Sequence, residues 1–164
     1  MKKVLVVMGS DSDLKVMQGT VDQLKAFEIP FEVRIASAHR TPALAEDLAK
    51  NAADRGFGVI VAAAGKAAHL AGVLAAYTTL PVIAVPIKSS TLDGLDSLLS
   101  MVQMPKGIPV ACMAIDGADN AALFAVQVLA LSEPVLAQKL VDYKADMARK
   151  VMEKDAAICK EYNV

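Results

Sequence analysis

His39 and Arg40 are the side chains of this sequence best placed to do chemistry. They lie in the run Ser-Ala-His-Arg-Thr-Pro at residues 37–42, between an apolar segment and the start of a helix. A histidine there can exchange a proton near neutral pH, and an arginine can bind a phosphate or carboxylate through two parallel hydrogen bonds. Equally, His39 could fill a turn while Arg40 is solvated, because so short a motif often matches by chance.

A second polar run, Gly-Ser-Asp-Ser-Asp at residues 9–13, follows the first apolar segment. Hydroxyls and free amides at the start of a helix, with the helix dipole behind them, form a site for an anion. Asp13 could accept hydrogen bonds from the hydroxyls of a ribose. The alternative is that Ser12 simply caps the helix.

A third segment, residues 62–72, contains six alanines and two glycines around Lys66 and His69. Small side chains allow the backbone to approach a flat ligand closely and leave room for a very small molecule beside it. A histidine on an apolar segment is more often a packed core residue than a catalyst. The expected closeness of His69 to residues 37–42 favours the functional interpretation.

Alternating strands and helices must position these loops. The apolar runs at residues 3–8, 31–36, 59–63, 81–85 and 109–113 are predicted strands. The first helix is predicted to begin near Ser12. Thr41 is the predicted N-cap and Pro42 the first residue of the second helix, which runs to about Arg55 with Gly56 as its left-handed terminator. The alternation predicts an α/β fold, a flavodoxin-like doubly wound parallel five-stranded sheet in three αβα layers. All three loops then lie at the carboxyl edge of the sheet.

The composition excludes several classes of function. Lys plus Arg total 17 against 18 for Asp plus Glu, so no basic surface indicates nucleic acid or an anionic membrane as a partner. No run reaches the roughly 20 apolar residues of a membrane span, and the first run stops at Gly9, too early for a signal peptide. Cys112 and Cys159 fit neither a metal-ligand spacing nor a redox pair, which indicates reduced thiols in a cytoplasmic protein.

The apolar content indicates an assembly of several subunits. Hydrophobic residues make up 55% of the chain and aromatic residues only 4%, which is more apolar surface than one small core hides. Residues 121–131 have Gln127 as their only strongly polar side chain, and residues 133–162 form a long helix with an apolar stripe. We expect a single domain at 1–164, with an α/β core at 1–131 and a C-terminal helical arm at 132–164 that lies on a neighbouring subunit.

Four motifs of this sequence occur together in one known protein family. They are Gly-Ser-x-Ser-Asp at residues 9–13, Ser-Ala-His-Arg-Thr-Pro at 37–42, Ala-Ala-His-Leu at 67–70 and Gly-x-Asp-Ser-Leu-x-Ser-x-Val-Gln-Met-Pro at 94–105. With these motifs the chain resembles the bacterial-type (class I) 5-(carboxyamino)imidazole ribonucleotide mutases, the catalytic subunit family of phosphoribosylaminoimidazole carboxylase. The resemblance extends from the first strand to at least Leu131.

The resemblance implies an isomerase of purine biosynthesis that needs neither cofactor nor metal. The carboxylate leaves the exocyclic nitrogen as carbon dioxide, stays trapped and bonds to a ring carbon, giving 4-carboxy-5-aminoimidazole ribonucleotide. His39 matches the group that protonates the leaving nitrogen and later takes the ring proton. The residues that match phosphate and ribose contacts are Ser10, Ser12, Asp13, Ser37 and Arg40. The residues that match the wall around the base and the carbon dioxide are Gly65, His69 and Leu70. The implied assembly is a homo-octamer.

The sequence departs from the family pattern beside the expected substrate. Lys66, Ala63 and Ala84 stand where glycine is usual, and Ala71 stands where proline is usual. Lys66 could point out of the pocket or could place its ammonium beside the migrating carboxylate. The outward orientation is favoured here, because lysine is rarely buried without a partner.

Three rival functions compete with the mutase. A phosphorylated receiver domain would need an aspartate at the end of the third strand and a lysine at the end of the fifth, and the sequence has neither. An inactive nucleotide-binding paralogue that lost turnover through Lys66 remains open. So does a direct carboxylase or decarboxylase acting on aminoimidazole ribonucleotide with free carbon dioxide.

Overall fold

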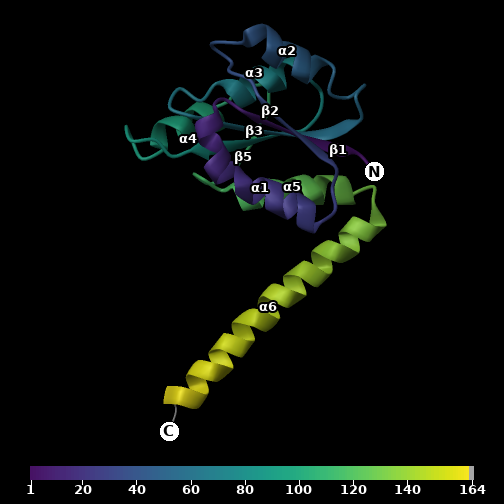
Figure 1. Cartoon of the computed structure of the whole chain (residues 1–164), viewed down its shortest axis with the longest axis vertical. Helices are drawn as coiled ribbons and strands as arrows, with labels where there is room; N and C mark the ends of the chain where they lie inside the picture. Colours follow the sequence, from purple (N-terminus) through teal and green to yellow (C-terminus); the bar gives the residue numbers. More distant parts are fainter. Residues whose placement is uncertain (163–164) are drawn as a thin grey trace.

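Five parallel strands form one central sheet, with helices on both faces (Figure 1). The structure is a computed structural model and describes residues 1–162. The strands are β1 (Lys3–Met8), β2 (Phe31–Ile35), β3 (Phe57–Gly65), β4 (Val82–Ile87) and β5 (Ala111–Cys112). The helices are the 3-10 turn η1 (Asp11–Asp13), α1 (Leu14–Ala26), α2 (Pro42–Lys50), α3 (Leu70–Tyr77), α4 (Leu95–Val102), α5 (Ala118–Ala130) and α6 (Pro134–Tyr162).

The strand order is β2-β1-β3-β4-β5, which confirms the predicted flavodoxin-like topology. The chain starts at β1 inside the sheet, adds β2 on one side, and then crosses to β3 on the other. The direction in which strands are added to the sheet therefore reverses after β2. At such a switch point a ligand crevice is expected outside the carboxyl ends of the strands, between the loops that follow them.

Two apolar layers hold the sheet between its helices. Alternate residues of β1 face opposite sides, so Val4 and Val6 pack under α1 and α5, whereas Leu5 and Val7 pack under α2 and α3. Strands β1, β3 and β4 are buried on both faces, as their continuous apolar sequences predict. No helix among residues 1–162 is long and apolar enough to cross a membrane.

Several predicted boundaries were wrong by a few residues. The first helix begins at Leu14 rather than near Ser12, because η1 occupies the preceding turn. The second helix ends at Lys50 instead of extending towards residue 55, although Gly56 does take the predicted left-handed conformation with φ of 85°. Strand β5 pairs only through Ala111 and Cys112, and the predicted segment begins at a proline that has no N–H to donate to the sheet.

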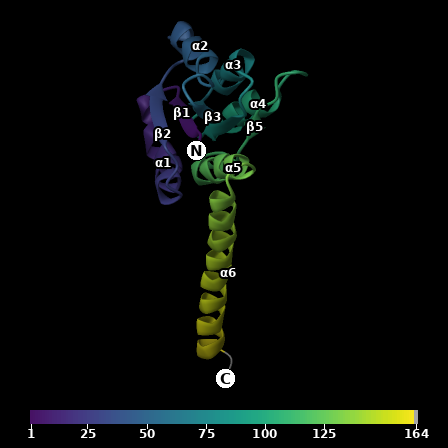
Figure 2. The same ribbon diagram turned by 90° about the vertical axis from the view of Figure 1, so that its right-hand side faces the viewer.

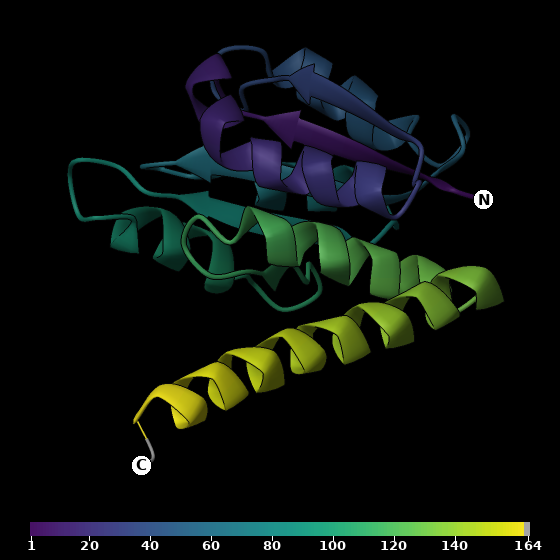
Figure 3. The same ribbon diagram turned by 60° about the horizontal axis from the view of Figure 1, so that its bottom comes forward.

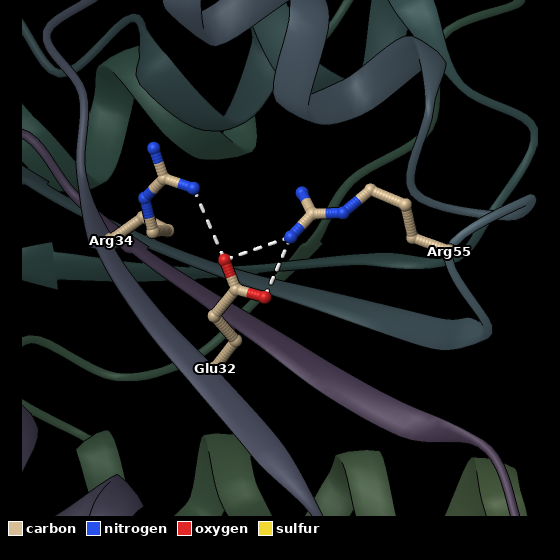
Figure 4. A network of polar contacts seen from close by, with 3 residues as sticks. All are labelled: Glu32, Arg34 and Arg55. Carbon is tan, nitrogen blue, oxygen red and sulfur yellow. Dashed lines mark hydrogen bonds and ion pairs between the residues drawn. The ribbon is translucent and has the colours of Figure 1, made fainter.

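Edge strand β2 carries a charged network instead of an open row of apolar side chains (Figure 4). Glu32 accepts hydrogen bonds from Arg55, at 2.6 and 2.9 Å, and from Arg34, at 3.1 Å. The pKa of Glu32 is lowered, first by Arg55 and then by Arg34. Charges on an edge strand discourage pairing with a second sheet, and Arg55 also ties β2 to the turn that precedes β3.

Helix α6 confirms the predicted long C-terminal helix and extends well beyond the body of the molecule (Figures 1 and 2). Its first turns pack beside α5 (Figure 3). Leu136 is buried there, and the Tyr143 ring lies 5.5 Å from that of Phe27. After Asp146 every described side chain of α6 is exposed. The last two residues of the predicted arm, 163 and 164, lie outside the described part of the chain.

Candidate active site

A cleft of about 630 Å³ opens at the carboxyl edge of the sheet. Loops after β1, β2, β3 and β4 surround it. Its lining residues are Gly9, Ser10, Ser12, Asp13, Ser37, Ala38, His39, Arg40, Ala64, Gly65, Lys66, Ala67, His69, Leu70, Ile87, Lys88 and Ser89. All nine residues predicted for the site are among them.

The loop after β1 is held by a capping box. The Ser10 hydroxyl accepts a hydrogen bond from the Ser12 N–H at 3.3 Å, and the Asp13 carboxylate accepts one from the Ser10 N–H at 3.2 Å. The capping residue is therefore Ser10 and not Ser12, the alternative weighed from sequence. Asp13 is buried, and burial raises its pKa although hydrogen bonds from Ser10, Ser12 and Gly9 oppose the effect.

The loop after β2 is closed by hydrogen bonds between its two ends. The Thr41 hydroxyl accepts from the Ser37 N–H at 2.8 Å, and the Thr41 N–H donates to the Ser37 carbonyl at 2.9 Å. Thr41 is the N-cap of α2, as predicted, although its side chain makes no capping hydrogen bond. Pro42 is the first residue of α2, as predicted. The closed loop fixes the directions of His39 and Arg40.

Arg40 joins the loops after β1 and β2. Its Nη2 donates to the Gly9 carbonyl at 3.3 Å and its Nε to the Ser37 hydroxyl at 3.4 Å. The same hydroxyl accepts from the Arg40 N–H at 3.1 Å. The remaining guanidinium N–H groups can bind an anion beside the Ser10 and Ser12 hydroxyls.

His39 meets His69 inside the cleft. The Nε2 of His39 lies 2.8 Å from the Nδ1 of His69, and the two rings are inclined at 72°. One nitrogen donates and the other accepts, according to the tautomer. His69 precedes α3 and its carbonyl accepts the Val73 N–H at 3.0 Å, so this ring is carried on a hydrogen-bonded helix start. The predicted closeness of the two histidines is confirmed.

The end of β3 brings the backbone close to its neighbour. A Cβ on Gly65 would lie 3.3 Å from the Ile87 carbonyl oxygen, which explains a glycine at this position. Lys66 follows with φ of 57°, a conformation that favours glycine. Lys66 is exposed and is one of the residues that line the cleft. Leu70 begins α3 and is buried under it.

The loop after β4 is a part of the cleft that the sequence analysis missed. Ile87, Lys88 and Ser89 contribute to the lining. The Lys88 N–H donates to the Asp116 carboxylate at 2.8 Å, and its ammonium lies 3.4 Å from Asp93. The sequence does contain a pattern that could have indicated this loop, because a polar run directly follows a predicted strand, as it does in the other loops of the cleft. Among the described residues, no group of three His, Cys, Asp or Glu side chains could hold a metal ion.

Comparison with known proteins matches this arrangement to one family. Residues 3–150 match the family described as AIR carboxylase (AIRC). The chain belongs to this family. The match includes all five strands and every lining residue of the cleft, so it covers the whole candidate site.

Curated members of the family have two different names. The N5-carboxyaminoimidazole ribonucleotide mutase of Pyrococcus horikoshii is 57% identical over 149 residues, covering 91% of this chain and 84% of the relative. A chloroplastic phosphoribosylaminoimidazole carboxylase of Vigna aconitifolia is 51% identical over 146 residues, covering 89% of this chain and 26% of the relative. The crystal structure of Treponema denticola PurE superposes with a TM-score of 0.85 at 30% identity, over 94% of this chain and 96% of that one.

Proposed function

We propose that the protein is an N5-carboxyaminoimidazole ribonucleotide mutase, an isomerase of purine biosynthesis. The observation that supports it best is the His39–His69 pair, with 2.8 Å between Nε2 and Nδ1, in a cleft that also contains an arginine-based anion site. A relative with this name and 57% identity covers 91% of the chain. The substrate is an imidazole ribonucleotide, and carbon dioxide is the migrating group.

The phosphate and ribose are assigned to the loops after β1 and β2. The Arg40 guanidinium and the hydroxyls of Ser10 and Ser12 hold the phosphate, and Ser37 fixes Arg40 through two hydrogen bonds. The buried Asp13 carboxylate accepts hydrogen bonds from the ribose hydroxyls. This placement directs the imidazole base towards the histidines and the loop after β3.

The reaction moves one carboxyl group within the cleft. His39 donates a proton to the exocyclic nitrogen while the bond between that nitrogen and the carboxyl carbon breaks, and its electron pair stays on nitrogen. The ring carbon then attacks the released carbon dioxide, forming a carbon–carbon bond. His39 removes the proton from that ring carbon and returns to its first state, so the same group acts as acid and then as base.

The walls of the cleft keep the carbon dioxide from escaping. Gly65 allows β3 and β4 to approach closely, and Leu70 supplies an apolar surface at the start of α3. His69 contacts His39 and fixes the direction of its Nε2 atom. Exclusion of water also prevents loss of the reactive intermediate to solvent.

Direct carboxylation of aminoimidazole ribonucleotide is the second candidate. It is favoured by the relative named phosphoribosylaminoimidazole carboxylase, whose matching part is 51% identical. Both reactions make the same carbon–carbon bond and differ only in the source of the carbon dioxide. The cleft needs no second nucleotide site for either of them.

An assay with separate substrates distinguishes these functions. The protein is given N5-carboxyaminoimidazole ribonucleotide, aminoimidazole ribonucleotide with bicarbonate, or 4-carboxy-5-aminoimidazole ribonucleotide, and ultraviolet absorbance is followed. A mutase converts the first and last into each other without added bicarbonate. Conversion only of aminoimidazole ribonucleotide with bicarbonate supports the carboxylase, and tight binding without turnover supports an inactive paralogue.

A homo-octamer is part of this proposal. One exposed apolar stripe consists of Leu95, Leu99 and Val102 on α4, together with Leu92 in the turn before it. A separate apolar groove of about 340 Å³ lies between α5 and α6, and Val141, Val151 and Ile158 are exposed on α6. Two distinct apolar surfaces allow a closed assembly larger than a dimer. The proposal also includes a single domain, with its core at residues 1–131 and a helical arm from residue 132 onward, that acts in the cytoplasm.

A further inference from the structure

Lys66 combines an unfavourable backbone conformation with a position in the active-site cleft. Its φ of 57° lies in the left-handed region, where a side chain costs free energy that glycine does not. The residue is exposed to the cleft and stands three positions before His69 on the same loop. Strained residues that persist in a cleft indicate a functional constraint.

The loop gives Lys66 little freedom to leave this position. Gly65 pairs with Ile87 at the end of β3, and the space for its Cβ is limited by the Ile87 carbonyl at 3.3 Å. On the other side, the His69 N–H donates to the Ala67 carbonyl at 3.0 Å and α3 begins directly afterwards. The backbone of Lys66 is therefore fixed between a strand end and a helix start.

Positive side chains line the cleft from two separate loops. Arg40 lies on the side of β1 and β2, where it bonds to Gly9, and Lys66 lies on the side of β3. The other lysine of the lining, Lys88, has its ammonium 3.4 Å from the Asp93 carboxylate. None of the ion pairs among residues 1–162 includes Lys66. A ligand with two separate anionic groups matches this distribution.

We propose that Lys66 is a specificity-determining residue whose ammonium binds the carboxylate of the substrate. The inference rests on the proposed mutase function, in which the phosphate occupies the Arg40 end and the carboxylated base reaches the histidines. An ammonium beside the carboxylate forms a charge-assisted hydrogen bond. Lys66 thus favours carboxylated imidazole ribonucleotides over the uncarboxylated nucleotide that shares their phosphate, ribose and ring.

The test compares two nucleotides with a panel of Lys66 variants by titration calorimetry. The nucleotides are 4-carboxy-5-aminoimidazole ribonucleotide and 5-aminoimidazole ribonucleotide, which differ only in the carboxylate. Lys66→Gly and Lys66→Asn remove the charge with residues that tolerate positive φ, and Lys66→Arg keeps the charge. Glu28→Gly is the matched control, because Glu28 has φ of 58° and lies outside the cleft lining.

The proposal predicts a selective loss of affinity. Lys66→Gly and Lys66→Asn weaken binding of the carboxylated nucleotide about tenfold, the scale of one charge-assisted hydrogen bond, and leave the uncarboxylated nucleotide within about twofold. Lys66→Arg keeps the preference, and Glu28→Gly changes neither affinity. Lys66→Gly also raises the melting temperature, because glycine removes the backbone strain.

Two results would overturn the role of Lys66. One is an equal loss of affinity for both nucleotides, which would make the effect one of loop structure. The other is unchanged affinity for both, which would make Lys66 a surface residue. Failure of the wild-type protein to turn over any carboxylated ribonucleotide in the absorbance assay would instead contradict the proposed function itself. The wild-type and variant measurements therefore separate the two claims.

Discussion

The Nε2 of His39 and the Nδ1 of His69 are 2.8 Å apart, so the two rings share one hydrogen bond. Two fully protonated rings would bring two N–H donors face to face, which this contact does not permit. The pair therefore holds at most one proton between the rings while the contact lasts. The contact with His69 fixes the orientation of the His39 ring, to which we assign the proton transfer.

Replacing His39 tests its role as acid and base. His39→Asn is expected to lower kcat at least about 100-fold, the scale of a lost proton-transfer group, while substrate affinity changes much less. Steady-state kinetics and calorimetry measure the two effects separately. A variant with kcat within a few-fold of the wild type would remove His39 from the mechanism.

The sequence predicted the strand order, because each polar or small-residue loop follows an apolar run. The nine candidate residues came from the family resemblance, and all of them line the cleft. The sequence could not predict the hydrogen bond between His39 and His69. Strand β1 lies between β2 and β3, so the contact depends on how two loops bend across the sheet edge. Local sequence patterns contain no information on that distance.

Three other features of the site were not predicted from the sequence. Lys88 and Ser89 were not among the residues predicted for the site, and the pairing of β4 with β3 brings them to the cleft. The conformation of Lys66 was also hidden, because nothing in the residue type indicates a φ of 57°. Ser10 rather than Ser12 caps η1, because the Ser10 N–H also donates a hydrogen bond to the Asp13 carboxylate and completes a capping box.

Replacing Arg40 tests the anion site. The wild-type protein is expected to bind the ribonucleotide at least about 100-fold more tightly than the matching nucleoside, because charged hydrogen bonds to phosphate contribute about 1.5–3 kcal/mol each. Arg40→Met should remove much of this difference without weakening nucleoside binding. Equal affinities of the wild-type protein for the two ligands in calorimetry would exclude the phosphate site.

The pKa of Asp13 makes a prediction for stability against pH. Burial raises this pKa in the folded protein, so the folded state binds the proton more tightly than the unfolded state. The stability that this proton binding contributes is complete below the ordinary pKa of 3.8 and is lost as pH rises through the folded pKa.

Asp13→Asn should therefore be more stable than the wild type at pH 7, and the difference should shrink as pH falls towards 4. Urea unfolding at several pH values measures it. The matched control is Asp54→Asn, an exposed site, which should show no such pH-dependent gain. A gain that is constant with pH would argue against a buried charged carboxylate. The same variant should bind the ribonucleotide less tightly, because it loses the ribose acceptor.

The exposed apolar surfaces predict an assembly of several subunits, and the family resemblance implies that it is an octamer. Light scattering at micromolar concentration should give the mass of an octamer. Leu99→Lys places a charge in the stripe on α4, where Leu99 is 48% exposed, and should reduce the mass without unfolding the subunit. Lys154→Ala, at an exposed charged position of α6, provides a control. A monomeric wild type would contradict the assembly.

Transfer of labelled carboxylate tests the proposed reaction most directly. The substrate is N5-carboxyaminoimidazole ribonucleotide with ¹³C in its carboxylate, incubated with the protein in an excess of unlabelled bicarbonate, and the product is analysed by mass spectrometry. Since the released carbon dioxide stays in the cleft, the account predicts that 4-carboxy-5-aminoimidazole ribonucleotide retains the label. A product that carries carbon from the bicarbonate pool, or no product at all, would contradict it.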